Sequence, residues 1–301
     1  MAKARMSSLD ISCMAAVLQR QALGYRVSNV YDISPKLYLL KLAKPDSKIF
    51  IVVESGVRFH VTEFVREKGN VPSLFTLKLR KHIRTRRIEQ VSQLGSDRIV
   101  DLQLGTGEAA YHLICELYGT GNIVLTDHAY NIVTLLRNGK HDNDVRLHVK
   151  NIYPRESVRE RATGVTEEWL RTELASVEKG ATVRQLLNSK LGVGKEIVEH
   201  CLAASGLAPN AKAKQLGETL ALDDGSSSAA AGIKALVCAL AEAEEFFAQS
   251  REGHVKGYIV HKILQPKVEW SPSGPGVFSN SGGSGVLNYG GAAEGVGGGE
   301  G

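Results

Sequence analysis

The sequence lacks the features that define several common classes of protein. Its four cysteines are far apart and form no C-x-x-C pair, which excludes a zinc ribbon: Cys13, Cys115, Cys201 and Cys238. No apolar run approaches the ~20 residues needed to cross a bilayer, and the first residues, MAKARMSSLD, hold no apolar stretch of a secretion signal. We therefore expect reduced thiols, no membrane partner and a cytoplasmic location, with a nuclear one as the alternative.

Motifs of enzymes are equally scarce. The sequence contains no P-loop, no G-x-S-x-G and no H-E-x-x-H, and its nine histidines are scattered. Gly119-Thr120-Gly121 lies between two predicted strands, which favours a hairpin loop over a phosphate cradle. Glu54 has no second carboxylate at a spacing suited to acid–base catalysis. We expect a protein that is not an enzyme and that carries no cofactor and no metal.

The first half of the chain is rich in short runs typical of β-strands. Their short, turn-forming links predict antiparallel meanders. We expect one helix from Ser7 or Ser8 to Leu23, and another over residues 73–87 with an apolar stripe of Leu74, Leu77 and Ile83. The predicted strands lie near residues 26–33, 36–42, 48–55, 57–64, 87–94, 97–104, 110–118, 121–127 and 131–137.

The second half of the chain has helical patterns. Thr166 and Thr182 each precede a helix, a third helix stops at Gly206, and AGIKALVCALAEAEEFF forms a fourth. The tail from Ser271 holds 12 glycines in 31 residues and has too few apolar residues to fold. We predict a β-rich domain over residues 1–150, a helical linker over 151–180, a helical module over 181–262 and a disordered Gly/Ser-rich tail over 263–301.

Positive charge is concentrated in the first half. Residues 1–150 hold 22 Lys+Arg against 14 Asp+Glu, a balance of +8, whereas the remainder has a balance of −3. The cluster KLRKHIRTRR is either a solvated helix face or a polyanion site, and its arginines suit bidentate contact with phosphate. We favour RNA binding. Its six cations, with no acid among them, are Lys78, Arg80, Lys81, Arg84, Arg86 and Arg87.

A second candidate site lies in QLGSDRIVDLQ. Asp97-Arg98 follows the turn signal Gly95-Ser96 and precedes a predicted strand. Neighbours on a strand point to opposite faces, so the acid and the cation should each have a partner of their own. The structural alternative is a turn acid beside a surface ion pair. For Asp10 the structural alternative is an acid in the first turn of a helix.

The order of these motifs resembles a known family. SSLD, RVSNVYDIS, ESGVRFHVTEF, PSLFTLKLRKHIRTRR, QLGSDRIVDLQ, ELYGTGNIVLTD and GYIVHK together resemble the N-terminal domain of the NFACT family, from about residue 3 to about residue 262. That family includes the eukaryotic nuclear export mediator factor, the CAT-tailing factor of ribosome quality control, and bacterial relatives described as fibronectin-binding proteins. The resemblance implies an α+β fold. It comprises a β-sandwich resembling formamidopyrimidine-DNA glycosylases and a helix–two-turns–helix-like module. The likeness ends near Lys262, where the disordered Gly-rich tail predicted from composition follows.

The resemblance also implies a function. Family members bind the large ribosomal subunit carrying an obstructed peptidyl-tRNA. They recruit tRNA that extends the stalled chain without mRNA, and the ribosome performs the peptidyl transfer. Family residues required for this tailing match Asp10, Asp97 and Arg98. The family's coiled-coil arm, which reaches the E3 ligase Listerin, has no counterpart after Lys262, so support of that ligase is in question for this chain.

Two other functions stay open. One is a non-enzymatic scaffold that binds RNA or protein, as the name of the bacterial relatives suggests. The other is a DNA glycosylase, suggested by fold alone. Those enzymes use an N-terminal proline and usually a four-cysteine finger, whereas this sequence begins Met-Ala-Lys and has no such finger. We therefore expect no DNA partner.

Overall fold

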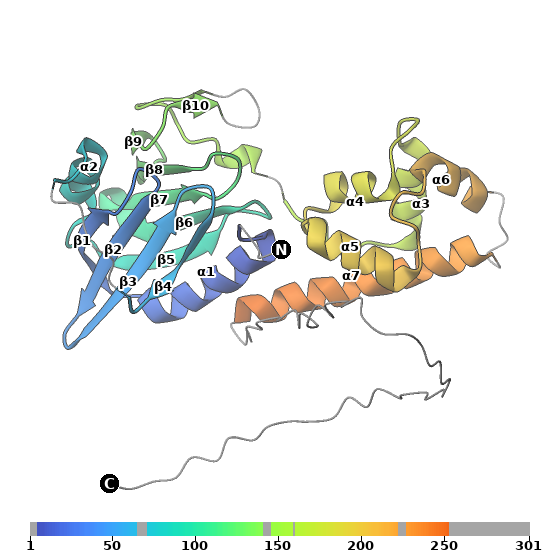
Figure 1. The fold of residues 1–301 in the computed structure, drawn as a ribbon, viewed down its shortest axis with the longest axis horizontal. Coiled ribbons are helices and arrows are strands. Elements are labelled where there is room, and N and C mark those ends of the chain that lie inside the picture. Colours follow the sequence, from blue (N-terminus) through green and yellow to red (C-terminus); the bar gives the residue numbers. More distant parts are fainter. Residues whose placement is uncertain (1–4, 65–70, 141–145, 159, 222–226, 253–301) are drawn as a thin grey trace, which may run out of the picture. The chain divides into compact units, whose positions relative to one another are not determined.

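The fold is seen in a computed structural model, which describes residues 5–64, 71–140, 146–158, 160–221 and 227–252 (Figure 1). These residues belong to one compact unit, residues 1–256. The tail predicted over residues 263–301 lies outside the described residues.

Two antiparallel sheets form the first part of the chain. Each is a meander in which strands adjacent in sequence are hydrogen-bonded neighbours, as the short links predict. The first sheet consists of β1 (Arg26–Asp32), β2 (Leu37–Lys44), β3 (Ser47–Glu54) and β4 (Arg58–Thr62). The second consists of β5 (Ile88–Gln93), β6 (Ile99–Leu104), β7 (Tyr111–Glu116), β8 (Asn122–Asp127) and β9 (Ile132–Leu135), and a small pair follows, β10 (Gly139–Lys140) with β11 (Arg146–Leu147).

The two sheets share one hydrophobic core. Leu40 and Ile51 of the first sheet and Leu102 and Leu113 of the second are all at most 1% exposed and belong to the same buried cluster. Strands whose alternate residues are apolar bury one face against a facing sheet, which gives a β-sandwich. The predicted α+β fold class is confirmed.

Helix α1 (Ser8–Ala22) begins as the sequence predicts. Ser7 is its N-cap, and Asp10 occupies the third helical position and completes a capping box. Ile11 and Leu18, separated by two helical turns, are fully buried in the core of the sandwich. Leu9 instead packs against the core of the helices that follow later in the chain. The helix therefore contacts both parts of the structure.

Helix α2 (Leu74–Ile83) is shorter than predicted. It ends at Ile83, not at Arg87, because Thr85 has φ +65° and the residues after it pair with β1. The backbone N–H of Val27 donates to the carbonyl of Arg86, and the N–H of Thr85 donates to the carbonyl of Val27. These sheet-like bonds draw residues 85–88 out of the helix, although their side chains are compatible with one.

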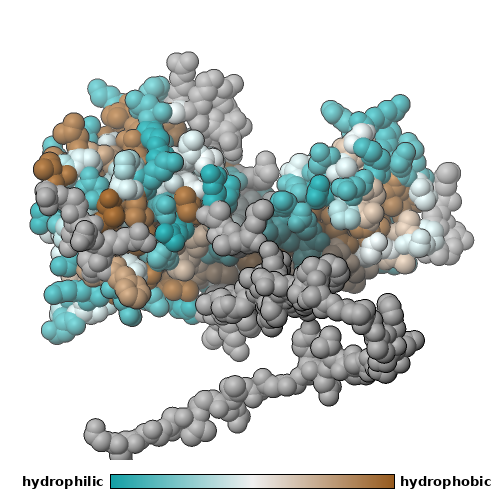
Figure 2. All heavy atoms as spheres, viewed as in Figure 1, coloured by the Kyte–Doolittle hydropathy of each residue, from teal (hydrophilic) through white to brown (hydrophobic). Residues whose placement is uncertain are grey.

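The predicted apolar stripe of α2 is also wrong in part. Ile83 is fully buried, but Leu74 is 81% exposed and Leu77 is 47% exposed, whereas Leu79 is buried. Figure 2 shows hydrophobic residues at the surface on the side where α2 lies. Which face of a short helix is buried depends on how the helix is oriented against the sheet. The spacing of leucines alone does not determine that orientation.

Five helices form the second part of the chain, with a core of their own. They are α3 (Glu167–Ser176), α4 (Val183–Leu191), α5 (Lys195–Ser205), α6 (Ala213–Ala221) and α7 (Ser228–Glu252). Thr166 and Thr182 cap α3 and α4 as predicted, and the left-handed glycines Gly192 and Gly206 end α4 and α5. Within the described ranges, no helix is long and apolar enough to cross a membrane.

Candidate nucleic-acid interface

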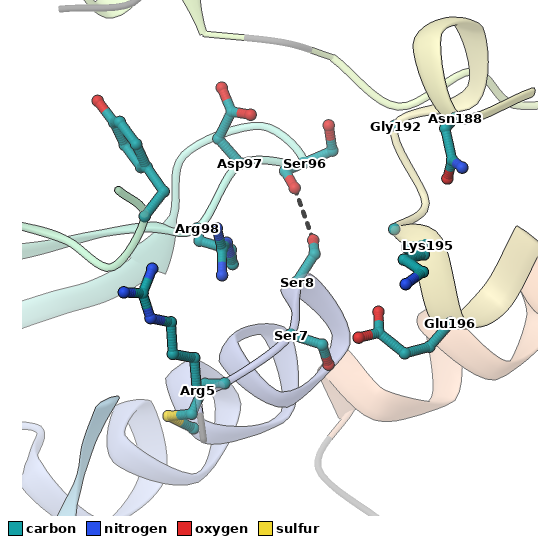
Figure 3. A pocket seen from close by; sticks show the side chains of 13 residues that line it. Arg5, Ser7, Ser8, Ser96, Asp97, Arg98, Asn188, Gly192, Lys195 and Glu196 are labelled. Carbon is teal, nitrogen blue, oxygen red and sulfur yellow. Dashed lines mark hydrogen bonds between the residues drawn. The ribbon is translucent and has the colours of Figure 1, made fainter. Parts of the chain in front are cut away.

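A pocket of about 730 Å³ lies beside the N-terminus of α1 (Figure 3). Four segments that are far apart in the sequence form its walls: the start of α1, the turn between β5 and β6, the turn between β7 and β8, and α4 with the start of α5 and the turn between them. The lining residues are Arg5, Met6, Ser7, Ser8, Ser96, Asp97, Arg98, Tyr118, Asn188, Gly192, Gly194, Lys195 and Glu196.

The turn that carries Asp97 and Arg98 is a tight hairpin loop. The N–H of Leu94 donates to the carbonyl of Ile99 at 3.0 Å, and the N–H of Asp97 donates to the carbonyl of Leu94 at 3.3 Å. Gly95 has φ +54°, a left-handed conformation that suits glycine. The pair therefore lies in the turn before β6 and not on the strand itself, and its two side chains need not alternate between sheet faces.

Hydrogen bonds fix this turn to the start of α1. The Ser8 hydroxyl donates to the carbonyl of Ser96 at 2.6 Å, a bond drawn as the dashed line in Figure 3. The Gln93 side-chain amide donates to the carbonyl of Asp97 at 2.8 Å and to the Ser8 hydroxyl at 3.0 Å. Ser96 is itself buried. The pair is thus presented by a rigid backbone.

The two side chains of the pair point in different directions. In Figure 3 the Asp97 carboxylate projects away from Arg98, and Arg98 points toward the side of the pocket where Arg5 lies. Both residues are half-buried. Within the residues that the structure describes, the Arg98 guanidinium makes no hydrogen bond or ion pair, although its carbonyl accepts from the N–H of Leu117 at 2.7 Å. This cation is available to an external anion.

The opposite wall comes from the helical part of the chain. Asn188 belongs to α4, and Lys195 and Glu196 form the first turn of α5. Figure 3 shows these side chains across the pocket from Asp97 and Arg98. The Gly192 backbone lies so close to the Ser96 turn that an added Cβ would stand 2.6 Å from the Ser96 hydroxyl. No sequence motif marks the residues of this wall.

Asp10 lies just outside the pocket lining. Its carboxylate accepts hydrogen bonds from the Ser7 N–H at 2.7 Å and from the Ser7 hydroxyl at 2.9 Å. These contacts make Asp10 part of the cap of α1, the structural role that its position in the sequence allows. Because Ser7 lines the pocket, Asp10 also fixes one edge of it.

The predicted basic cluster forms a separate site. A second pocket, of about 530 Å³, lies at the end of α2 and is lined by Arg26, Lys81, His82, Arg84, Thr85, Arg86, Arg87, Glu89, Gly105, Thr106 and Ala109. Burial, together with the neighbouring Lys81, Arg86 and Lys78, lowers the pKa of His82. The positive charge at neutral pH therefore belongs to lysines and arginines. Lys78 and Arg80, predicted as part of the same site, do not line this pocket.

The cations of this cluster differ in their contacts. Arg80 donates through Nε to the carbonyl of Val30 at 2.7 Å and is thus used inside the fold. Arg87 pairs with Glu89 at 2.7 Å, and the Arg86 guanidinium lies 5.3 Å from the ring centre of Tyr111. Arg84 is exposed. The six predicted residues therefore do not form one uniform face.

Arg26 joins the same pocket from β1. Its Nη1 donates to the carbonyl of Thr85 at 2.8 Å, beside the isolated bridge between Arg26 and Arg87. The basic pattern of the sequence does not include it because it lies 52 positions before the cluster begins at Lys78. No local pattern marks such a residue.

A buried polar cluster on the second sheet was also missed. The Asp101 carboxylate lies 3.0 Å from His112 Nδ1 and accepts from the Tyr130 hydroxyl at 2.8 Å. Asp101 and His112 are 5% and 7% exposed, and the Tyr130 ring stacks on the imidazole. Each polar group has its partner inside the protein, so the cluster holds segments together.

No metal centre is found within the described residues, where no three His, Cys, Asp or Glu side chains are placed to share an ion. The described residues thus define an α+β protein. Its β-sandwich and following helices both contribute side chains to one charged pocket.

The comparison with protein families identifies the family. The sequence profile described as "NFACT N-terminal and middle domains" matches residues 7–223. The chain belongs to the NFACT family, and the resemblance noted in its motifs is confirmed.

Several curated proteins are similar to this chain. "Ribosome quality control complex subunit NEMF" of Mus musculus is 41% identical over 261 residues, which cover 86% of this chain and 24% of the relative. The protein of the same name in Homo sapiens is 40% identical over 89% of this chain, again 24% of the relative. "Ribosome quality control complex subunit 2" of Schizosaccharomyces pombe is 34% identical. The chain spans about a quarter of the length of these relatives.

Solved structures confirm the fold. The N-terminal part of the fibronectin/fibrinogen-binding protein from Streptococcus suis matches with a TM-score of 0.52 and 20% identity, covering 81% of this chain and 85% of that one. The fibrinogen-binding protein from Staphylococcus aureus matches with a TM-score of 0.53 and 16% identity, covering 71% and 80%. The LlFpg protein in complex with DNA also matches, at a TM-score of 0.39 and 10% identity, a likeness too remote for any conclusion about chemistry.

Proposed function

We propose that this chain acts in ribosome quality control by binding tRNA at the pocket of Asp97 and Arg98. In this proposal it binds the large ribosomal subunit that carries an obstructed peptidyl-tRNA. The tRNA it recruits then extends the stalled chain without mRNA. Its relatives are named as subunits of the ribosome quality control complex, which supports this role. The chain itself performs no bond chemistry, because peptidyl transfer belongs to the ribosome.

One observation carries the proposal. Arg98 is held by a rigid turn at the edge of a pocket, and its guanidinium has no partner within the described residues. A half-buried cation without an internal partner is well placed for an external phosphate or base edge. Asp97, which projects from the same turn, would accept hydrogen bonds from ribose hydroxyls or base amino groups.

The proposal also covers the cellular location and further partners. We place the activity in the cytoplasm, where translation occurs. The basic turn, with Arg84, Arg86 and Arg87, would contact RNA phosphates outside the pocket. Support of the ligase Listerin would require the coiled-coil arm of the family.

The first prediction concerns Arg98. Arg98→Ala should weaken the binding of a fluorescently labelled tRNA transcript several-fold, and Arg98→Lys should restore only part of it, because lysine keeps the charge but not the planar fork. Asp97→Ala should also weaken binding. Fluorescence anisotropy measures affinity and thermal unfolding measures stability, for which we expect changes of less than about 1 kcal/mol.

The control is Arg58→Ala, which removes one positive charge from a half-buried pair with Glu54 outside the pocket. It should leave tRNA affinity nearly unchanged. A chimaera in which residues 1–262 replace the matching part of the human relative extends the test to tail synthesis on stalled subunits. Normal tRNA binding and normal tails in the Asp97 and Arg98 variants would sink the proposal, as would losses that merely follow the fraction of folded protein.

A further inference from the structure

The pocket of Asp97 and Arg98 has a second charged wall. Lys195 and Glu196 lie in the first turn of α5, and Asn188 lies in α4. All three side chains lie across the cavity from the Asp97–Arg98 turn (Figure 3). Neither the motifs nor the basic cluster of the first half of the chain includes them.

Lys195 has little to hold it within the fold. Its side chain is 68% exposed, and its contact with Glu199 is a long one, with 3.9 Å between Nζ and Oε1. Glu199 is also within 3.5 Å of Arg184, so that carboxylate is shared. Exposed pairs of this kind are worth well under about 1 kcal/mol. The ammonium can therefore turn to an anion in the pocket at little cost.

We propose that Lys195 and Asn188 complete the RNA site: Lys195 binds a phosphate of the same RNA segment that Arg98 contacts, and Asn188 hydrogen-bonds its sugar or base. This inference rests on the proposed function. In this arrangement the RNA contacts the β-sandwich and the helical part at the same time. A ligand gripped from two sides loses more orientational freedom than one bound on a single surface, and this grip fixes its register.

The charges of the cavity suit such a ligand. Arg5 and Arg98 stand on one side and Lys195 on the other, so phosphates that enter meet positive charge on both walls. Asp97 and Glu196 are acceptors, which fit ribose hydroxyls and base amino groups and repel phosphates that are placed wrongly. A volume of about 730 Å³ is within the ~300–1,000 Å³ of typical ligand pockets.

The test uses the complete 301-residue chain and a labelled tRNA transcript, with affinities measured over a range of salt concentrations. Lys195→Ala should weaken binding several-fold and reduce the slope of log affinity against log salt by about one unit, because one phosphate contact is lost. Lys195→Glu should weaken it further. Asn188→Ala should weaken binding without changing the slope, since it removes no charge.

The matched control is Lys234→Ala. Lys234 is an exposed lysine of α7 that does not line the pocket, and its loss changes the net charge by the same amount. If Lys195→Ala behaves like Lys234→Ala while Arg98→Ala still weakens binding, the proposed RNA contact of Lys195 is wrong and the proposed function stands. If neither Arg98→Ala nor Lys195→Ala has an effect, the proposed function itself fails.

Discussion

At the scale of single residues, Gly121 shows how closely the two sheets approach each other. A Cβ at this position would collide with the backbone of Gly56, which lies in the turn between β3 and β4. Arg137 bonds both turns: its Nη1 donates to the Ser55 hydroxyl at 3.1 Å and to the carbonyl of Thr120 at 2.7 Å. The Gly119-Thr120-Gly121 loop is a hairpin, as predicted from its place between strands, and the structure shows that it also packs against the turn between β3 and β4.

This approach predicts a large loss of stability for Gly121→Ala. The new methyl group must displace backbone, and the left-handed φ of +70° adds strain. We expect a loss of about 3 kcal/mol or more in the free energy of unfolding, measured by denaturant titration. Gly119→Ala is the control, because Gly119 has φ +53° and an added Cβ there meets nothing within 4 Å. It should cost only ~1 kcal/mol. Equal losses for the two variants would show that the close approach is not what requires glycine at 121.

At the scale of elements, the cations of α2 and those of the basic turn after it have different roles. Arg80 on the helix is bonded to the carbonyl of Val30 in β1, whereas Arg84, beyond the end of the helix, is exposed. The turn exists because residues 85–88 pair with β1. A run of residues that favours a helix thus becomes helix as far as Ile83 and turn beyond it, and Lys81 of the helix lines the same pocket as the cations of the turn.

We therefore expect different effects from two sets of substitutions. Replacing Arg84, Arg86 and Arg87 together by Ala should weaken RNA binding across sequences and reduce the salt slope by about one unit per lost contact. Arg80→Ala should leave the slope unchanged and instead lower stability by about 1–2 kcal/mol, because a partly buried hydrogen bond from a charged group is lost. Salt-dependent anisotropy and thermal unfolding separate the two. An unchanged slope in the folded triple variant would make the turn a solvated surface, the alternative that the sequence left open.

At the scale of the whole molecule, the pocket depends on contacts between segments about 100 residues apart in the sequence. Ser8 bonds the carbonyl of Ser96, and Gly192 lies against the same turn. An added Cβ at Gly192 would stand 3.0 Å from the carbonyl oxygen of Glu160 as well as 2.6 Å from the Ser96 hydroxyl. Glycine at 192 thus sets how closely the α4–α5 turn approaches the turn of Asp97 and Arg98.

Gly192→Ala should weaken tRNA binding through this contact. The methyl group would displace the Ser96 turn and with it the Asp97–Arg98 pair, although no ligand-contacting side chain is changed. Gly206→Ala is a closely matched control: Gly206 also ends a helix, its φ is +70° against +64° at Gly192, and an added Cβ there meets nothing within 4 Å. Both variants should lose about 1 kcal/mol of stability from the left-handed conformation, and Gly192→Ala should lose more because its methyl group also displaces its neighbours. Equal tRNA affinities for the two would show that the contact at Gly192 does not shape the pocket.

The sequence by itself determined most of the elements and their order, although α6 (Ala213–Ala221) was not predicted. Strand alternation with short links predicted both meanders, and Ser7, Thr166 and Thr182 marked helix starts, because these signals act over a few neighbouring residues. The order of the motifs also identified the family, and with it Asp10, Asp97 and Arg98 as candidates. How those three residues act in this chain remains a prediction.

The tertiary structure alone decided where α2 ends, which of its cations are used inside the fold, and what faces Asp97 and Arg98. The helix ends early because Val27 of β1, distant in the sequence, forms hydrogen bonds with the backbone of Thr85 and Arg86. Lys195 and Asn188 enter the pocket because α1 packs against both cores and brings the α4–α5 turn beside Ser96. Such contacts depend on long-range packing, and no local pattern of residues encodes them.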